Sequence, residues 1–341
     1  MKPTTAHPSL RFVALLILCL LPSVAAAQIP QFDSFYVFGD SLADNGNILI
    51  QTGAMGMQPP VPPSTTPHRT YFKGRFSNGY ISFEYLWQRL TGHQPGSTLA
   101  LKPFLAAPLQ RANAIDFAFG GTGTPYVDKT PGGVSAPGLK GQIELFRLSL
   151  RGRRPSNRSL YAIATGANDY RLDAFNVPMN PADVVHNIED AIVSLYEMGA
   201  RDVIVLDLPD LGKIPANAID PVTSADATAI SAAHNAQLDS ALARLQARYP
   251  RLHLIAVKLD PLFDDLQTSM ESRLPLIDAF MPATPGVSAC LFINPASCVD
   301  VPSILFNADF GFLFWDVVHP TTEAYRLLGD YMYNDLASEY E

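Results

Sequence analysis

The chain has 341 residues, of which 48% are hydrophobic and 16% charged, and its formal net charge is −8. This apolar content is enough to bury a sizeable core and excludes an intrinsically disordered chain. The acidic balance repels phosphate backbones, so we expect no nucleic-acid partner, whereas a neutral or zwitterionic substrate is compatible with it.

The first 27 residues have the pattern of a secretory signal peptide. Lys2 and Arg11 precede an apolar run over residues 12–21, and three alanines come directly before Gln28. The run is too short to span a bilayer, which disfavours a membrane anchor. Its removal takes away both cations and no acid, so the net charge becomes −10. We therefore expect a secreted or periplasmic protein with one domain, 28–341, and no membrane-spanning segment.

Strand patterns alternate with amphipathic helical patterns along this domain. The predicted strands are 33–38, 115–119, 159–164, 202–208 and 252–257. The predicted helices are 80–90, 139–150, about 181–198, 224–248 with Ser224 as its N-cap, and about 321–337. This alternation predicts an α/β fold of three layers, with a central parallel sheet and helices on both faces.

Ser41, in Gly-Asp-Ser-Leu, follows the first predicted strand. Ligands of parallel sheets bind beyond the carboxyl ends of the strands, and Gly39 permits a sharp turn there. A serine at this position is a candidate nucleophile. Taken alone, the segment is more typical of a turn with Asx-type hydrogen bonds, because Asp-Asn-Gly-Asn follows it.

Asp316 and His319 lie near the end of the chain, in Asp-Val-Val-His-Pro. Histidine is well suited to accept a proton near neutral pH, and a carboxylate three residues earlier can fix its tautomer. Pro320 biases His319 away from helical geometry, just before the last predicted helix. A lone pair of this kind is more often a histidine at a helix start beside a surface aspartate.

Two further segments offer hydrogen-bond donors at strand ends. Asn168 follows strand 159–164 in Thr-Gly-Ala-Asn-Asp, and Gly121 follows strand 115–119 in Phe-Gly-Gly-Thr-Gly. An asparagine amide and a glycine N–H can both donate to a developing oxyanion. Each segment alone is also typical of an ordinary loop.

Together, and in their order along the chain, the four motifs resemble the GDSL family of esterases and lipases, also called SGNH hydrolases. The resemblance covers nearly all of residues 28–341 and is strongest to the family's bacterial branch of secreted phospholipases and haemolysin-like lipases. It implies a flavodoxin-like SGNH-hydrolase fold and serine-dependent hydrolysis of carboxylic esters through an acyl-enzyme. Residues 74–79, Gly-Arg-Phe-Ser-Asn-Gly, are similar to the lipase branch with a longer first crossover.

The resemblance also implies roles for individual residues. Ser41 is the expected nucleophile, and His319 is the expected base, oriented by Asp316. The expected oxyanion hole consists of the N–H groups of Ser41 and Gly121 and the Asn168 amide. Gly120, adjacent to Gly121, is the second choice for that backbone donor.

The sequence leaves several functions open. Lipid, lysophospholipid and short acyl esters are the expected substrates, while an acyltransferase or a carbohydrate O-deacetylase would use the same site. A non-catalytic lipid- or glycan-binding module is the alternative of a different class. The other histidines are scattered, and no dinucleotide or phosphate-binding glycine motif occurs, so neither a metal nor a cofactor is expected.

Two long proline-containing segments, 53–79 and 280–311, are expected either to wall the substrate cleft or to be solvent-facing connections. The second contains Cys290 and Cys298. Export to an oxidising compartment predicts a disulfide between them, with two free thiols as the alternative.

Overall fold

The structure is a computed structural model that describes residues 29–65, 68–69, 71–107, 113–264 and 313–340. The expected signal peptide, segment 280–311, Cys290 and Cys298 lie outside the described residues. Among the residues that are described, no helix has both the length and the apolar character needed to cross a membrane.

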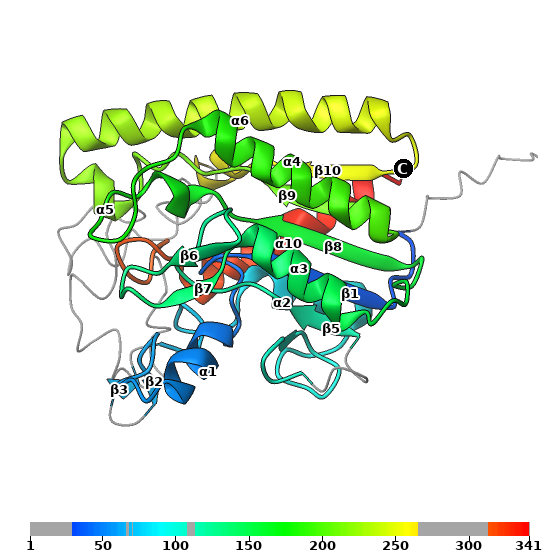
Figure 1. Cartoon of the computed structure of the whole chain (residues 1–341), viewed down its shortest axis with the longest axis horizontal. Helices are drawn as coiled ribbons and strands as arrows, with labels where there is room; N and C mark the ends of the chain where they lie inside the picture. The colour runs from blue at the N-terminus through cyan, green and yellow to red at the C-terminus, as the bar shows by residue number, and fades with distance from the viewer. Residues whose placement is uncertain (1–28, 66–67, 70, 108–112, 265–312, 341) are drawn as a thin grey trace, which may run out of the picture.

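A six-stranded sheet forms the centre of the molecule, and all its strand pairs are parallel (Figure 1). Its strands, in spatial order, are β10 (His253–Val257), β9 (Asp202–Leu206), β8 (Ser159–Ala164), β1 (Ser34–Gly39), β5 (Ala114–Asp116) and β4 (Lys102–Pro103). Apart from the edge strand β4, this is the 2-1-3-4-5 order of flavodoxin-like folds. The predicted fold class is therefore confirmed, and the point where the strand order reverses lies between β1 and β8.

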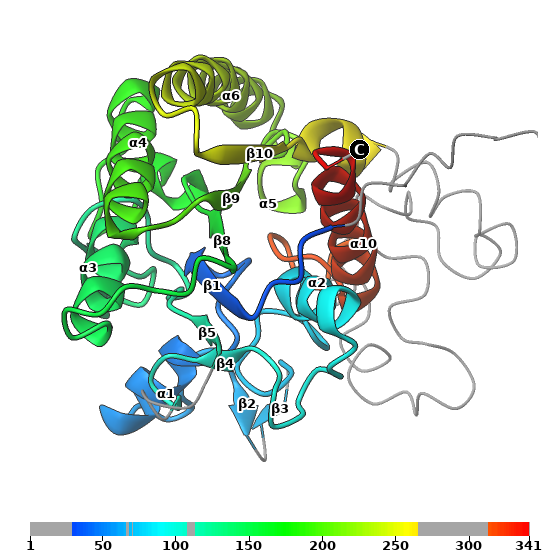
Figure 2. The same ribbon diagram turned by 90° about the vertical axis from the view of Figure 1, so that its right-hand side faces the viewer.

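Helices cover both faces of the sheet (Figure 2). One face carries α2 (Ser82–Thr91) and α10 (Thr322–Ser338), and the other carries α3 (Leu139–Ser149), α4 (Pro181–Met198) and α6 (Pro221–Arg248). Strand β1 shows why both layers are needed: Phe35 and Val37 pack into one core, while Phe38 packs into the other. Successive side chains of a strand point to opposite faces, so an almost fully apolar strand requires cover on both.

The predicted start of the long helix at Ser224 is wrong. Helix α6 begins at Pro221, and the Asp220 carboxylate accepts the Thr223 N–H at 2.8 Å as its N-cap. Proline is favoured at the first helical position because its φ is already helical and that N–H needs no partner. The Ser224 hydroxyl instead donates to the Gly212 carbonyl at 3.0 Å, which ties the helix to the loop after β9.

Several short elements were not predicted. They are the edge strand β4, α1 (Asn47–Ala54), β2 (Ser64–Thr65), β3 (His68–Arg69), β6 (Val127–Lys129), β7 (Ser135–Pro137), η1 (Ala167–Tyr170) and α5 (Pro215–Ala218). The predicted strand 115–119 is shorter as β5, yet the chain beyond it still follows β1. The Phe117 N–H donates to the Val37 carbonyl at 2.7 Å, and the Phe119 N–H donates to the Gly39 carbonyl at 3.2 Å. This path carries residues 120–124 to the carboxyl end of β1.

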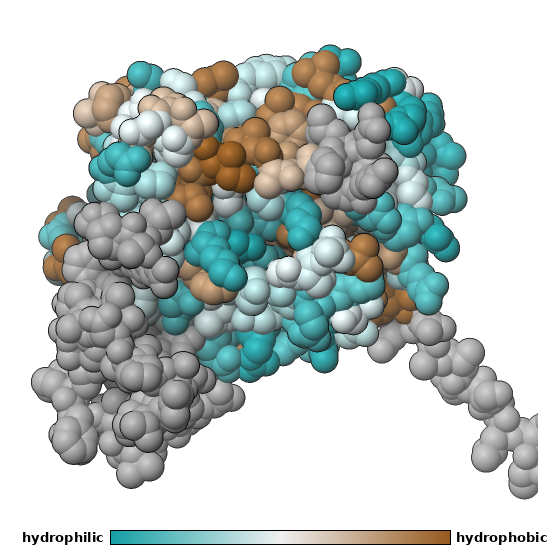
Figure 3. All heavy atoms as spheres, turned by 90° about the horizontal axis from the view of Figure 1, so that it is seen from below, coloured by the Kyte–Doolittle hydropathy of each residue, from teal (hydrophilic) through white to brown (hydrophobic). Residues whose placement is uncertain are grey.

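The surface seen from below carries hydrophilic residues over most of its lower part (Figure 3). Hydrophobic residues gather in a band above them. The apolar side chains of this face are therefore grouped rather than evenly spread, although exposed apolar residues are common on any protein surface.

Candidate active site

Ser41 lies just beyond the carboxyl end of β1, two residues after Gly39, where a side chain would not fit. A Cβ on Gly39 would lie 2.1 Å from the Ala164 carbonyl oxygen on the neighbouring strand β8. The Gln142 side chain, on α3, holds the same glycine by accepting its N–H and donating to its carbonyl, both at 2.8 Å. The chain therefore turns at a fixed point, with Ser41 at the point where the strand order reverses.

His319 contacts both other members of the expected triad. Its Nε2 lies 2.8 Å from the Ser41 Oγ, although 278 residues separate the two in sequence. Its Nδ1 lies 2.7 Å from the Asp316 Oδ2, and the Asp316 Oδ1 accepts the His319 backbone N–H at 2.7 Å. An Nδ1–H held by a carboxylate leaves Nε2 as the acceptor facing the serine hydroxyl.

Asp316 has a partner that the sequence did not predict. The Tyr71 hydroxyl donates to its Oδ2 at 2.7 Å. Burial acts to raise the pKa of Asp316, but the charge and hydrogen bonds of His319, together with Tyr71, hold that pKa below its ordinary value. The carboxylate is therefore ionised at neutral pH and can stabilise a protonated imidazole.

Residues 74–79 support the histidine loop instead of forming a wall of the apolar pocket described below. The Phe76 ring packs against the His319 ring, with centroids 4.9 Å apart. The Ser77 hydroxyl donates to the Pro320 carbonyl at 2.9 Å, and the Asn78 Oδ1 accepts the Thr322 N–H at 2.9 Å. The Gly-Arg-Phe-Ser-Asn-Gly motif was therefore a signal for residues that position the histidine.

The two adjacent glycines differ in what their N–H groups can do. The Gly120 N–H donates to the Asp44 Oδ2 at 2.8 Å, and a Cβ at this position would lie 2.3 Å from the Phe76 ring. Among the hydrogen bonds of the described residues, the N–H groups of Gly121 and Ser41 have no protein acceptor, although both residues are buried. Buried N–H groups without acceptors are uncommon, and here they suit a bound oxyanion.

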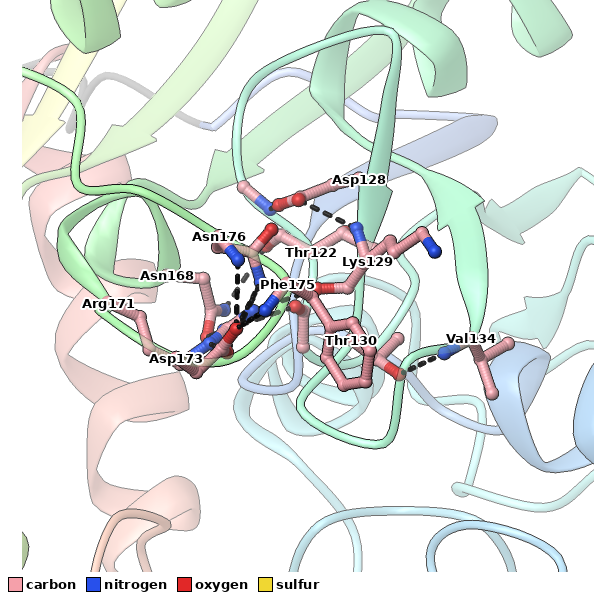
Figure 4. A network of polar contacts seen from close by, with 12 residues as sticks. Thr122, Asp128, Lys129, Thr130, Val134, Asn168, Arg171, Asp173, Phe175 and Asn176 are labelled. Atoms are coloured by element: carbon pink, nitrogen blue, oxygen red, sulfur yellow. Dashed lines mark hydrogen bonds and ion pairs between the residues drawn. The ribbon is translucent and has the colours of Figure 1, made fainter.

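Asn168 lies in η1, the turn after β8. Its Nδ2 donates to the Thr122 carbonyl at 3.1 Å, and its Oδ1 accepts from the Arg171 Nη1 at 2.7 Å (Figure 4). One of its two amide hydrogens is used by Thr122, and the amide also lies close enough to the Asp40 carboxyl group to lower the pKa of that group by hydrogen bonding. The structure thus brings the predicted donor segments 120–124 and 166–170 together.

Buried carboxylates hold segment 120–124 from two sides. Asp44 accepts from Gly120 and from three N–H groups at the start of α1, and Asp169 accepts the Thr124 N–H and hydroxyl. Burial raises the pKa of each to about 6 against these hydrogen bonds. The predicted Asx-type turn at Asp44 exists, but it also binds a loop 76 residues away.

Asp40, directly before Ser41, is also buried. Burial raises its pKa to about 7, although the Leu42 N–H, the charge of His319 and the Asn168 amide all act to lower it. A second carboxyl group therefore lies under the site, and among the described residues it makes no hydrogen bond to the Ser41 hydroxyl.

An apolar pocket opens beside Ser41 and Asn168. Its apolar lining comes mainly from the segments after β9 and β10 and from the segment before Asp316, and includes Leu206, Leu208, Leu211, Ile214, Phe263 and Phe314. Among the described residues, none from 53–79 lines it. The loop after β9 was not predicted to wall the site; its signal was the set of apolar residues Leu208, Leu211 and Ile214, which stand between polar residues beyond the strand.

The described residues contain no group of three or more His, Cys, Asp and Glu side chains arranged to hold a metal ion. The polar groups around Ser41 are instead one imidazole, backbone and amide N–H groups, and carboxylates that are already hydrogen-bonded. These groups can move a proton and stabilise a developing negative charge.

The fold and the enzyme class are those of a hydrolase that acts on esters. The chain belongs to the GDSL-like lipase/acylhydrolase family, whose model matches residues 35–332. All four predicted motifs lie inside that range.

Relatives of known name match over nearly their whole length. The chain is 29% identical to a phosphatidylcholine-sterol acyltransferase of Aeromonas hydrophila, covering 97% of this chain and 98% of that one. It is 23% identical to a GDSL esterase/lipase of Arabidopsis thaliana, covering 94% of each. Among solved structures, a lipolytic G-D-S-L family member from Veillonella parvula has 12% identity and a TM-score of 0.41, covering 87% of this chain and 94% of that one.

Proposed function

We propose that the chain hydrolyses carboxylic esters through an acyl-enzyme on Ser41. His319 takes the Ser41 proton as the hydroxyl oxygen attacks the ester carbonyl, and the C–O bond to the alcohol breaks as His319 returns a proton to the leaving oxygen. Water then attacks the acyl-enzyme by the same route and releases the acid. The observation that carries this proposal is the 2.8 Å contact between Ser41 Oγ and His319 Nε2, next to N–H groups that have no acceptor among the described residues.

Three donors form the proposed oxyanion hole. They are the backbone N–H groups of Ser41 and Gly121 and the second amide hydrogen of Asn168. Such donors stabilise the transition state because they are already oriented when the negative charge develops. Asp316 is proposed to fix the His319 tautomer and to stabilise the imidazolium that forms during each half of the reaction.

The proposed substrates are esters with an apolar acyl group, from short acyl esters to lipids and lysophospholipids. The apolar pocket beside Ser41 and Asn168 supports this choice, because leucine, isoleucine and phenylalanine side chains make up much of its lining and form no hydrogen bonds with sugar hydroxyl groups. The acidic chain also fits a neutral or zwitterionic substrate better than an anionic one.

Transfer of the acyl group to an alcohol is the second candidate function. It is supported by the 29% identity to the phosphatidylcholine-sterol acyltransferase over nearly the whole chain. The two reactions differ only in whether water or an alcohol reaches the acyl-enzyme. Adding a sterol or a simple alcohol to the assay and measuring free acid against new ester would separate them.

The test of the proposed function is a series of p-nitrophenyl esters from acetate to palmitate. Ser41→Ala is expected to lower turnover to the uncatalysed background, while Ser240→Ala, on the surface of α6, is the matched control and keeps wild-type turnover. Mass spectrometry of the quenched enzyme should find the acyl group on Ser41. Full turnover by purified Ser41→Ala would overturn the assignment.

Export and the disulfide are proposed alongside this activity. We propose that the protein is secreted or released into the periplasm. Removal of residues 1–27 during export would leave Gln28 as the first residue. The intact mass of the exported protein measures this, and a difference of about two hydrogens between its non-reduced and reduced forms would support the Cys290–Cys298 disulfide. A full-length mass would contradict the export proposal.

A further inference from the structure

An asparagine side chain serves an oxyanion hole in only one of its two orientations. Rotation by 180° about the Cβ–Cγ bond exchanges Nδ2, which donates, with Oδ1, which only accepts. In one orientation Asn168 offers an N–H to an oxyanion, and in the other it offers a repelling oxygen. Something in the protein must therefore select between the two.

Two neighbours of Asn168 distinguish the orientations. The Thr122 carbonyl can only accept and lies 3.1 Å from Nδ2, while the Arg171 guanidinium can only donate and lies 2.7 Å from Oδ1. Rotating the amide would set oxygen against oxygen and donor against donor. We propose that Arg171 is a positioning residue that locks the Asn168 amide in its donating orientation; this inference rests on the proposed function.

Arg171 makes several hydrogen bonds besides the one to Asn168. Its Nη1 also reaches the Gly121 carbonyl at 3.3 Å, its Nη2 donates to the Lys129 carbonyl at 2.8 Å, and its Nε donates to the Asp173 carboxylate at 2.5 Å (Figure 4). Its side chain is only 19% exposed. The residue thus contacts two of the three residues that supply the proposed donors and joins them to the β6–β7 hairpin.

The counter-charge of Arg171 is fixed as well. The Asp173 Oδ1 accepts the N–H groups of Phe175 and Asn176 at 2.7 and 2.9 Å, and the Asn176 amide donates to the same Lys129 carbonyl. The backbone N–H of Phe175 and the Arg171 side chain lower the pKa of Asp173 to about 2, so it stays ionised. A paired guanidinium contributes geometry more than net positive charge, and a lysine could not reproduce its planar fork.

A double-mutant cycle on p-nitrophenyl ester hydrolysis tests this role. Arg171→Met, which keeps the apolar stem, is expected to lower kcat about 10- to 100-fold with little change in KM, as expected for a lost hydrogen bond to a charged group. Arg171→Lys should recover only a small part of kcat. In the Asn168→Ala background, Arg171→Met should change kcat less than about twofold, because the amide it orients is gone.

The outcomes separate this inference from the proposed function. Equal fold losses in both backgrounds, or wild-type kcat for Arg171→Met, would overturn the positioning role while an inactive Ser41→Ala left the proposed function intact. An active Ser41→Ala would overturn the proposed function itself. Arg147→Met, which removes an exposed arginine paired with Glu144, is the matched control and should leave kcat unchanged. If Arg171→Met does not fold, Arg171→Lys in both backgrounds carries the same comparison.

Discussion

The two halves of the candidate site are built in different ways. On the base side, His319 and Asp316 lie three residues apart and already share two hydrogen bonds. On the donor side, three supporting contacts join distant segments: Gly120 with Asp44, Thr122 with Asn168 and Thr124 with Asp169, at separations of 45 to 76 residues. A base can be oriented locally, whereas donors that must converge on one oxygen have to be assembled by the fold.

The difference also extends to charge. The base side depends on one carboxylate whose pKa is held low by His319 and Tyr71, while the donor side uses carboxylates whose pKa burial raises to about 6. We therefore expect the base side to fail abruptly when one group is lost. The donor side should weaken in steps, since the proposed oxyanion hole divides the negative charge among three donors.

The largest effect after the loss of Ser41 is expected at Asp316. Asp316→Asn keeps the shape of the side chain but no longer favours an Nδ1–H tautomer of His319, and kcat should fall about 10⁴-fold. Tyr71→Phe is the matched control: it removes one donor to the same oxygen but leaves the charge, so kcat should fall only about tenfold. Steady-state kinetics on a p-nitrophenyl ester measure both, and comparable losses would contradict the difference drawn between the triad and its support.

A smaller effect is expected at the donor side. Asn168→Ala removes one of three donors, and kcat should fall about 10²- to 10³-fold with KM nearly unchanged. Turnover should remain above that of Ser41→Ala, because the N–H groups of Ser41 and Gly121 still face the oxyanion. A fall to the uncatalysed background would mean that the loss of one donor abolishes turnover, as the loss of one group on the base side is expected to do.

The smallest effect is expected on the free energy of unfolding at acid pH, and it comes from a histidine buried beneath the donor side. His234 is fully buried under the turn that carries Asn168, with its Nδ1 2.7 Å from the Tyr170 hydroxyl, and burial lowers its pKa to about 4. A histidine held neutral contributes stability fully above its unfolded pKa of about 6.5, and this contribution is lost as the pH falls toward 4. The loss amounts to about 3 kcal/mol.

Buried carboxylates with raised pKa values act in the opposite direction, so the measurement must be a difference. His234→Asn keeps a partner for Tyr170 but does not titrate there. Urea unfolding of wild type and variant between pH 7 and pH 4 should show the wild type losing about 3 kcal/mol relative to the variant. The exposed His186→Asn is the matched control, whose curve should run parallel to the wild type. Parallel curves for His234→Asn would contradict the assignment.

The order of strands and helices could be read from the sequence, because apolar periodicity is a local property. Strand 159–164 and helix 181–198 were predicted with their observed bounds. Three of the four motifs could also be placed at strand ends, and the fourth could be placed after the apolar stretch near residue 314. The start of α6 was predicted wrongly because Ser224 was taken as the N-cap, although Asp220 followed by Pro221 is the stronger local signal for a helix start.

What the sequence determined by itself was which chemical groups the chain offers and which apolar segments they follow. Only the tertiary structure decided which of the two adjacent glycines donates its N–H to Asp44, which way the Asn168 amide points, and that the Tyr71 hydroxyl contacts Asp316. These outcomes depend on contacts between segments tens to hundreds of residues apart. No local pattern indicates such contacts, because the partners come together only when the strands assemble into the sheet and the helices pack on its two faces.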